Sequence, residues 1–263
     1  MQITIDKQAV QASFSKAASR YDIFADLQRE IGHQLLGLVD EPKSSASALD
    51  LGCGTGYFSQ LLNNINTVKQ LTCFDLSPAM LAQVKQKQLT GCRLIEGDID
   101  NLPFDPCQFD LVFSSLVLQW SQDLTSCLMQ IKQVLNDKGT LYFSTLLTGS
   151  LFELEQAWLR VDKHQHINQF LSKQQVTTAL QEAGFTDIEL GTETRIKRYP
   201  DIISVMKALK GIGANHVHGK KQDHLSGKQL LEKLAQAYQA FVDDNGMYCL
   251  SYQVCYVVAK VSN

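Results

Sequence analysis

The sequence predicts a single α/β domain built on a mostly parallel β-sheet. Strand-like and helix-like patterns alternate for about a hundred residues after residue 46, and such alternation is typical of βαβ units. A glycine-rich turn follows the first of these strands, where open α/β sheets bind their ligands. A length of 263 residues fits one such domain that carries an insertion.

Two amphipathic helices are expected before the first strand. One covers residues 8–19 and the other about 22–39, since each range carries apolar residues three or four positions apart. Residues 41–45 have the composition of a linker, with one proline and two serines. We therefore expect residues 1–45 to form a helical lid ahead of the core.

Residues 46–194 are the predicted core, in which short apolar runs suit buried parallel strands. The core strands are expected at 46–51, 70–75, 92–96, 109–114, 139–145 and 185–194. Helices are expected between them at 56–63, 77–88, 122–135, 151–161 and 172–183. A basic helical insertion is then expected at 195–245, and residues 246–263 are expected to contain one last long strand at 248–259.

The composition is that of a globular protein in a reducing compartment. Hydrophobic residues make up 44% and charged residues 19%, and no stretch approaches the roughly 20 apolar residues of a membrane span. The N-terminus lacks the basic start and apolar run of a secretory signal. The seven cysteines form no Cys-x-x-Cys pair, which suits buried free thiols. A cytoplasmic location is expected.

The charge is distributed unevenly along the chain. The formal net charge is -3, but residues 195–228 contain eight Lys or Arg and two acids, a local charge of +6. This segment is a candidate surface for an acidic partner, and a solvated helical surface is the alternative. Nucleic acid is the weaker interpretation, because aromatic residues are sparse there and the whole chain is mildly acidic.

Three glycines occupy the turn after the first strand, at Gly52, Gly54 and Gly56. A dinucleotide fingerprint needs its third glycine one residue later, and no Lys-Ser or Lys-Thr follows as a phosphate-binding P-loop requires. Asp50 precedes the turn, where its carboxylate would repel a diphosphate but can accept hydrogen bonds from an ammonium group. The turn therefore favours a cofactor that bears an amino acid, such as S-adenosylmethionine (SAM).

Acidic residues also follow the next two strands. Asp75 ends the second strand and can accept both ribose hydroxyls, with Leu76 beside it. Asp98 follows the third strand, where it can accept from the adenine amino group while Ile99 packs against the ring. Each acid alone would suit a turn or a helix cap. Their combination with the glycine turn predicts a SAM site.

These motifs resemble those of class I SAM-dependent methyltransferases over about residues 46–145. The resemblance implies a Rossmann-like, seven-stranded, mostly parallel sheet with an antiparallel last strand. It also implies SAM as the cofactor and S-adenosyl-L-homocysteine as the product. In that family the strand at 109–114 ends at the methyl donor, so Ser114, Ser115 and Leu116 are expected to border the sulfonium.

Four further segments are similar to the malonyl-[acyl-carrier protein] O-methyltransferases of biotin synthesis. They are residues 14–22, 118–120, 149–154 and 209–216, of which the Lys-Gly-Ile-Gly-Ala-Asn stretch is the most specific. This resemblance implies transfer of a methyl group to the free carboxylate of a malonyl thioester on acyl carrier protein. That carboxylate is already ionised at neutral pH, so the reaction needs positioning and no general base.

Several residues are predicted to position the acceptor. Tyr21 is interpreted as a lid residue that reaches the cofactor or the carboxylate, with a core tyrosine as the equal alternative. Gln119 and Trp120 are candidates for a pocket wall. His216 is interpreted as a hydrogen-bond donor to the thioester or the carboxylate, with a surface histidine as the alternative, and His218 as a substrate contact.

Basic residues of the insertion are candidates for contact with the acidic carrier protein or its phosphopantetheine phosphate. They are Arg195, Lys197, Arg198, Lys207 and Lys210. The histidines of the insertion lack supporting carboxylate or cysteine spacing, so no metal site is expected. No nucleic-acid or membrane partner is expected.

Two alternatives stay open at this stage. One is a methyltransferase of another small acceptor, a carboxylic acid or a quinone precursor, because the sheet determines the cofactor and not the acceptor. The other is a protein that binds SAM without catalysis.

Overall fold

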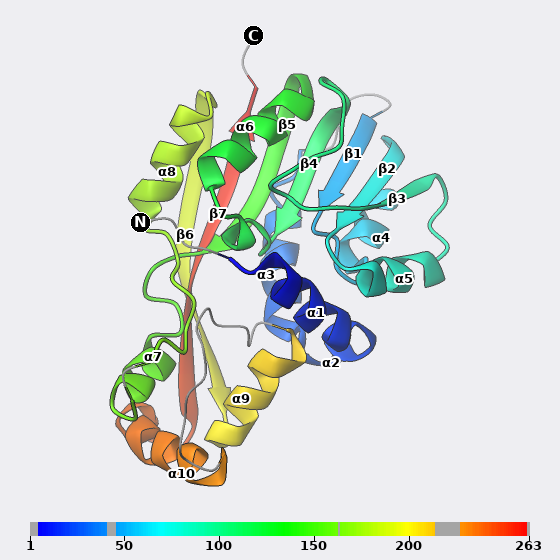
Figure 1. The fold of residues 1–263 in the computed structure, drawn as a ribbon. Coiled ribbons are helices and arrows are strands. Elements are labelled where there is room, and N and C mark those ends of the chain that lie inside the picture. Colours follow the sequence, from blue (N-terminus) through cyan, green and yellow to red (C-terminus); the bar gives the residue numbers. More distant parts are fainter. Residues whose placement is uncertain (1–4, 41–45, 163, 214–226, 262–263) are drawn as a thin grey trace.

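The protein is described by a computed structural model that covers residues 5–40, 46–162, 164–213 and 227–261. One seven-stranded sheet organises it, in the order β3-β2-β1-β4-β5-β7-β6 (Figure 1). The strands are β1 (Ala46–Leu51), β2 (Val68–Asp75), β3 (Cys92–Glu96), β4 (Phe109–Ser115), β5 (Leu135–Leu146), β6 (Asp187–Tyr199) and β7 (Tyr248–Lys260). Each strand lies close to the range expected from the sequence, except that β5 begins at Leu135 instead of residue 139 and β6 continues past residue 194.

The strand directions confirm the predicted sheet. β1 pairs in parallel with β2 and β4, β2 with β3, and β4 with β5. β7 is antiparallel to both β5 and β6. The carboxyl ends of the parallel strands therefore lie along one edge, where open α/β sheets bind ligands.

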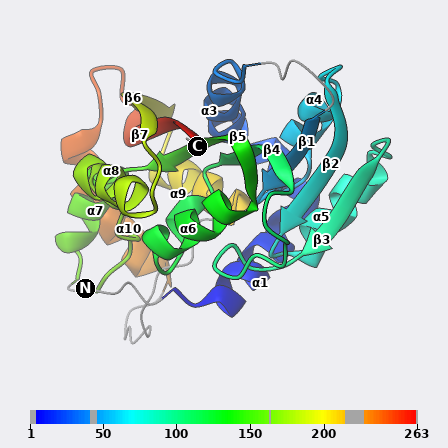
Figure 2. The ribbon, with the colours of Figure 1, turned by 90° about the horizontal axis from the view of Figure 1, so that it is seen from above.

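Helices cover both faces of the sheet, as Figure 2 shows from above. The chain forms α1 (Lys7–Ala17), η1 (Ala18–Arg20), α2 (Tyr21–Phe24), α3 (Asp26–Leu36), α4 (Tyr57–Asn63), α5 (Pro78–Gln86), η2 (Leu118–Trp120), α6 (Leu124–Val134), α7 (Phe152–Leu159), α8 (Lys173–Glu182), α9 (Ile202–Gly211), α10 (Gly227–Tyr238) and η3 (Gln239–Phe241). α3 and α4 pack on one face, and α6 and α8 pack on the other.

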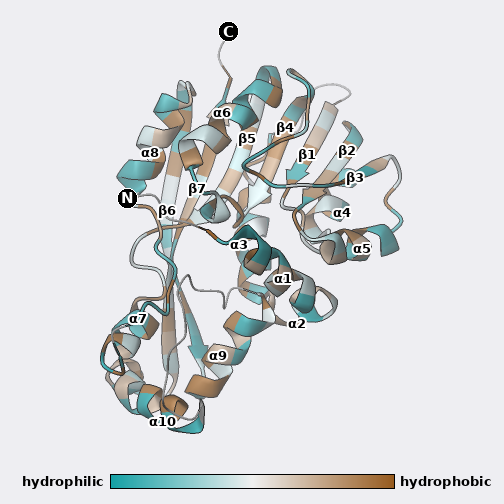
Figure 3. Ribbon diagram, viewed as in Figure 1, coloured by the Kyte–Doolittle hydropathy of each residue, from teal (hydrophilic) through white to brown (hydrophobic). Residues whose placement is uncertain are grey.

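The two cores follow the alternation of side chains along the central strands. Ala48 and Phe113 face the core under α3 and α4, and their neighbours Leu49 and Val112 face the core under α6 and α8. Figure 3 shows the apolar character of these strands against the polar outer helices. In the part of the chain that is described, no helix is long and apolar enough to cross a membrane.

β6 continues beyond the end expected from the sequence. The prediction stopped this strand at residue 194 and gave the basic residues from Arg195 onwards to a helical insertion, but the strand runs to Tyr199. β6 is an edge strand that pairs only with β7, and the part of β7 before Val254 pairs only with β6, because β5 ends at Leu146 opposite Val254. The outer part is thus a two-stranded ribbon, and its exposed residues can be charged without disturbing a core.

Three helices pack around this ribbon, in the lower part of Figure 1. They are α7, α9 and α10. At the N-terminus, the helix expected over 22–39 is two helices, α2 and α3, which are separated at Ala25. α1, η1 and α2 cross the carboxyl ends of the parallel strands, so they are placed to cover a ligand bound there.

Candidate functional site

The glycine turn adopts the backbone that its sequence predicts. Gly52, Gly54 and Gly56 all have positive φ, of 76°, 54° and 78°, which side chains rarely tolerate. A Cβ on Gly52 would lie 2.3 Å from the side chain of Val117, whereas the space around Gly54 is open. Gly56 caps the N-terminus of α4. The turn therefore presents bare backbone at the position of Gly54.

The Asp75 carboxylate accepts two backbone hydrogen bonds, one of which comes from the glycine turn. Its Oδ2 accepts from the backbone N–H of Gly54 at 2.9 Å, and its Oδ1 accepts from that of Ser77 at 2.8 Å. Burial raises the pKa of Asp75 to about 6, and the two backbone donors oppose that rise. Each carboxylate oxygen keeps a lone pair for a further donor.

Asp50 lies deeper in the same crevice and is 2% exposed. Its Oδ2 accepts from the Ser59 hydroxyl at 2.6 Å. Burial raises the pKa of Asp50 to about 7, against the effect of the Ser59 hydrogen bond. A cationic ligand beside Asp50 would lower this pKa again, so the site favours an ammonium group.

The N-terminal helices close over these acids through polar contacts. Lys7 of α1 forms ion pairs with Asp98 and Asp100, at 2.6 and 2.7 Å. Gln11 donates to the Leu76 carbonyl at 2.8 Å. Two further contacts join Ser15 to Ser77 and Asp22 to Thr55, each at 2.8 Å. The segment expected to act as a lid therefore contacts the predicted cofactor residues directly.

A cavity of about 90 Å³ lies under this lid. Most of the predicted cofactor residues line it, namely Gly52, Gly54, Asp75, Leu76, Asp98 and Ile99. Three predicted residues lie elsewhere, namely Gly56, Asp50 and Ser114, which is described below. Gly56 belongs to the start of α4, and Asp50 lines an adjoining cavity of about 60 Å³.

The adjoining cavity contains a residue that the sequence did not indicate. Arg29 of α3 lines it together with Asp50 and Tyr57. Its guanidinium donates to the Asp22 carbonyl at 2.7 Å and lies 5.8 Å from the Tyr57 ring centroid. No sequence motif links Arg29 to the glycine turn. Its place in this cavity is therefore visible only in the folded structure. Opposite charges at Asp50 and Arg29 suit a zwitterionic amino acid.

Ser114 does not border this cavity, although it was expected to. Its side chain is fully buried, and its hydroxyl donates to the Leu51 carbonyl at 2.9 Å. Successive side chains of a strand point to opposite faces, so Ser115 and Leu116 line the cavity instead. Leu116 has a φ of 57°, which is unusual for a side chain of this size and turns the chain toward η2.

Tyr21 lies where the cavities meet. It lines both cofactor-side cavities and a third one of about 110 Å³, here called the acceptor cavity. Its hydroxyl makes no hydrogen bond with the described residues. Burial, with the negative charges of Asp75 and Asp22, raises its pKa above the usual value. Tyr21 therefore stays neutral and can donate a hydrogen bond.

The acceptor cavity is mostly apolar. Its apolar lining comes from helices, loops and β7, and includes Leu116, Leu146, Leu151, Leu154, Trp158, Met206, Leu209 and Ile212. Polar side chains are few: Tyr21, Gln28, Gln119, His166, Asn168 and Tyr252. Within the described residues, Gln28 Oε1 and Asn168 Oδ1 are buried without a hydrogen-bond partner. Sequence reasoning did not single out either of these two residues.

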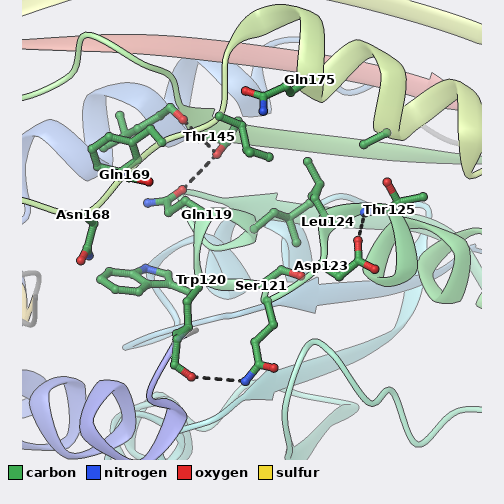
Figure 4. Close-up of a pocket in the computed structure, with 17 residues that line it drawn as sticks. Gln119, Trp120, Ser121, Asp123, Leu124, Thr125, Thr145, Asn168, Gln169 and Gln175 are labelled. Atoms are coloured by element: carbon green, nitrogen blue, oxygen red, sulfur yellow. Dashed lines mark hydrogen bonds between the residues drawn. The ribbon is translucent and has the colours of Figure 1, made fainter. Parts of the chain in front are cut away.

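Gln119 and Trp120 form part of the wall, in the place predicted for them. Gln119 accepts from the Thr145 hydroxyl at 3.3 Å, and Trp120 packs edge-to-face on Phe14 with ring centroids 5.6 Å apart. Both residues also line a neighbouring cleft of about 400 Å³ (Figure 4). Asn168 is shared by the cleft and the acceptor cavity.

The remaining predicted residues lie away from these cavities or outside the described residues. His216 and His218 lie outside them. Arg198 is on β6 and forms an ion pair with Asp243 at 3.0 Å. Lys210 is an exposed residue of α9. The part of the chain that the structure describes holds no cluster of three His, Cys, Asp or Glu residues suited to a metal ion.

Comparison with known proteins agrees with this geometry. A methyltransferase domain family matches residues 49–143. The malonyl-[acyl-carrier protein] O-methyltransferase of Serratia marcescens is 41% identical over 97% of this chain and 96% of its own length. The enzyme of the same name from Yersinia pestis is 41% identical over 97% and 92%.

Solved structures share the fold at low identity. The YcgJ protein of Bacillus subtilis has a TM-score of 0.63 at 13% identity, with 89% of this chain and 99% of that chain covered. An S-adenosylmethionine-dependent methyltransferase from Mesorhizobium loti has a TM-score of 0.53 at 19% identity, with 87% and 96% covered.

Proposed function

Since the chain belongs to the malonyl-[acyl-carrier protein] O-methyltransferase family, we propose that it methylates the free carboxylate of malonyl-[acyl-carrier protein]. Full-length similarity to these enzymes is the observation that carries the proposal. The products are the malonyl methyl ester and S-adenosyl-L-homocysteine. Esterification removes the charge from the chain end, so that fatty-acid enzymes can extend it toward the pimeloyl precursor of biotin.

The crevice at the strand ends fits SAM. Asp75 has lone pairs for the ribose hydroxyls, and Asp98 can accept from the adenine amino group once Lys7 releases it. Asp50 would hold the ammonium group and Arg29 the carboxylate of the methionyl part. Open space at Gly54 lets the cofactor approach the backbone. The same residues would bind S-adenosyl-L-homocysteine.

SAM would supply an electrophilic methyl group beside Ser115 and Leu116. The acceptor needs no base, because its carboxylate is ionised at neutral pH. Tyr21 can donate a hydrogen bond to the carboxylate oxygen that does not attack, which orients the other oxygen toward the methyl group. As predicted from the sequence, His216 is a second candidate donor to the thioester or the carboxylate.

The acceptor cavity suits the rest of the substrate. None of its lining residues is a lysine or an arginine among those that the structure describes, so the carboxylate is attracted mainly by the positive sulfonium. Exclusion of water strengthens this attraction. The unpartnered oxygens of Gln28 and Asn168 can accept from N–H groups, which the amides of a phosphopantetheine arm provide. The neighbouring Gln119 and Trp120 complete the wall.

The protein partner and the cellular location are also proposals. An acyl carrier protein would present the substrate, and contact through the basic segment 195–228 is a proposal from its charge. His218 is a proposed substrate contact within that segment. The cytoplasmic location stays a prediction from composition, as does the expectation that neither nucleic acid nor a membrane is a partner.

A methylation assay tests the proposal. We expect label from SAM to appear on malonyl-[acyl-carrier protein] with a kcat/KM far above that for free malonate or succinate. Malonyl-[acyl-carrier protein] whose carboxylate is already esterified is the matched control and should accept no label. Equal activity on the free dicarboxylic acids would contradict the substrate. If the protein retained SAM but methylated no acceptor, it would be a SAM-binding protein without catalytic activity.

A further inference from the structure

A groove on the outer surface separates the N-terminal helices from α9. It encloses about 550 Å³, and its lining includes four cations: Lys16, Arg20, Lys207 and Lys210. Two of them come from α1 and η1 and two from α9. All four are exposed. The fold therefore brings positive charge from both ends of the chain into one place, here called the basic groove.

The cations of the basic groove differ from those of β6 in their partners. On β6, Arg195 pairs with Glu193 at 2.6 Å, Lys197 with Glu30 at 2.9 Å and Arg198 with Asp243 at 3.0 Å. In contrast, no cation of the groove makes an ion pair with a described residue, and Arg20 lies over the Phe24 ring at 5.6 Å. Of the described cations in the basic segment, those of β6 are therefore paired within the fold, whereas Lys207 and Lys210 remain available to a partner.

Nearby acids are held by the chain itself. Asp22 accepts from the Thr55 hydroxyl at 2.8 Å. Asp201 caps α9 by accepting from the backbone N–H of Ser204 at 2.6 Å. Both carboxylates keep their negative charge, but among the described residues neither forms an ion pair with a cation of the groove.

The basic groove and the acceptor cavity lie on two sides of the same helices. Along α9, Met206 and Leu209 line the cavity, whereas Lys207 and Lys210 line the groove. The seam between the two is tight: a Cβ on Gly211 would lie 2.3 Å from the Phe24 ring. A partner held in the groove would thus stand next to the cavity in which its substrate arm must end.

Exposed apolar side chains occur on the same helical segments as the groove residues. Ile23 follows the groove residues of η1 and is 66% exposed, and Ile203 lies one turn before Lys207 on α9 and is 44% exposed. A docking surface commonly combines apolar contacts with charged residues at its rim. This pattern favours a protein partner over a free anion, which would need only the cations.

We propose that the basic groove docks the acidic surface of the acyl carrier protein around the base of its phosphopantetheine arm. This inference rests on the proposed function. Complementary charge speeds encounter and fixes orientation, and its effect declines with salt. The four cations, and not those of β6, select the carrier.

Charge reversal tests the groove. We compare two double variants of the groove, K207E/K210E and K16E/R20E, with the control K69E/K138E, whose two lysines are exposed. The control changes the net charge equally but lies outside the groove, on β2 and β5. Binding of malonyl-[acyl-carrier protein] to the protein saturated with S-adenosyl-L-homocysteine is measured by calorimetry, and kcat/KM is measured at low and high salt.

Each groove variant should weaken carrier binding about tenfold or more and flatten the salt dependence of kcat/KM. The control should stay within about twofold of the parent. The ratio of kcat/KM for malonyl-[acyl-carrier protein] to that for malonyl-coenzyme A should also fall at least about fivefold. An unchanged ratio would show that the groove holds the arm's phosphate and would overturn the proposal.

Other outcomes separate the two proposals. Carrier binding and methylation that survive groove reversal would refute the groove while the enzyme function stands. In another outcome, charge reversal in the groove abolishes carrier binding but the parent protein methylates nothing. This outcome would support the groove and refute the proposed function. Weaker binding in the Lys69 and Lys138 control alone would place the carrier elsewhere and refute the groove.

Discussion

The proposed cofactor crevice and the acceptor cavity differ in the chemistry of their linings. The crevice is built from strand ends and presents Asp50, Asp75 and Asp98 with backbone around them. In contrast, the cavity is lined by apolar side chains, with a few neutral amides. Tyr21 belongs to both. We therefore expect a charged cofactor to be held by hydrogen bonds and ion pairs, and its acceptor by shape and the exclusion of water.

This comparison predicts that substitutions separate into two groups. Changes in the crevice should weaken SAM binding, and changes in the cavity should lower turnover with malonyl-[acyl-carrier protein] while SAM binding stays. If one substitution weakened SAM binding and lowered turnover equally, the crevice and the cavity would act as one unit.

The largest effect is expected for Asp75→Ala. The substitution removes the acceptor for the ribose hydroxyls and the hydrogen bond that holds Gly54. Charge-assisted hydrogen bonds contribute about 1.5–3 kcal/mol each, so S-adenosyl-L-homocysteine should bind at least about 100-fold more weakly in calorimetry. Asp110→Ala, at the opposite end of the sheet, serves as the control. Unchanged affinity in the Asp75 variant would place the cofactor elsewhere.

Tyr21→Phe tests the residue that belongs to both the crevice and the acceptor cavity. It removes only the hydroxyl, whose hydrogen bond to the carboxylate is expected to contribute about 1.5–3 kcal/mol. Turnover with malonyl-[acyl-carrier protein] should fall roughly 10- to 100-fold, with SAM affinity within about threefold. Normal turnover, measured with labelled SAM, would make Tyr21 a packing residue.

The two buried carboxyl groups predict a pH effect confined to the crevice. Burial raises the pKa values of Asp50 and Asp75 to about 7 and 6, and SAM should bind their ionised forms. Binding therefore releases protons, and affinity should fall roughly tenfold between pH 8 and pH 6. Calorimetry in two buffers with different ionisation enthalpies measures the protons released. An affinity that rises on acidification would contradict this assignment.

The same groups predict the opposite trend for the ligand-free protein. A carboxyl group whose folded pKa is raised binds more protons in the folded state, so its contribution to stability declines as pH rises from about 4 to 7. The rise in melting temperature caused by S-adenosyl-L-homocysteine should therefore be larger at pH 8 than at pH 6.

The smallest effect is expected for Lys7→Met. Lys7 bridges α1 to Asp98 and Asp100, but partly exposed ion pairs contribute only about 0–1 kcal/mol. S-adenosyl-L-homocysteine should dissociate about two- to fivefold faster in stopped-flow experiments, because the lid opens more readily. A slower rate would show that Lys7 competes with the adenine amino group more than it closes the lid.

The crevice could be predicted from the sequence far better than the cavity. Glycine spacing and strand-end acids are local patterns, and Gly52, Gly54, Asp75 and Asp98 lie together as their spacing implies. Of the expected Ser114, Ser115 and Leu116, only Ser114 lies away from the cavity, because spacing alone does not tell which face of a strand a side chain takes.

The cavity comes from segments that only the fold brings together. Gln28, Asn168 and Met206 share no motif, yet they line one space. Arg29 could not be predicted from the sequence for the same reason. The basic run was visible in the sequence, but the partners of Arg195 and Lys197 were not, since Glu193 and Glu30 pair with them across the fold.

The ribbon of β6 and β7 carries much of the acceptor side on an extension outside the main sheet. Beyond Leu146 the two strands pair only with each other, so insertions and substitutions in α7, α9 and α10 leave the register of the five parallel strands untouched. Evolution can thus exchange the acceptor while inheriting the cofactor site whole. A chimera that takes its ribbon and helices from another methyltransferase is a practical route to new ester products.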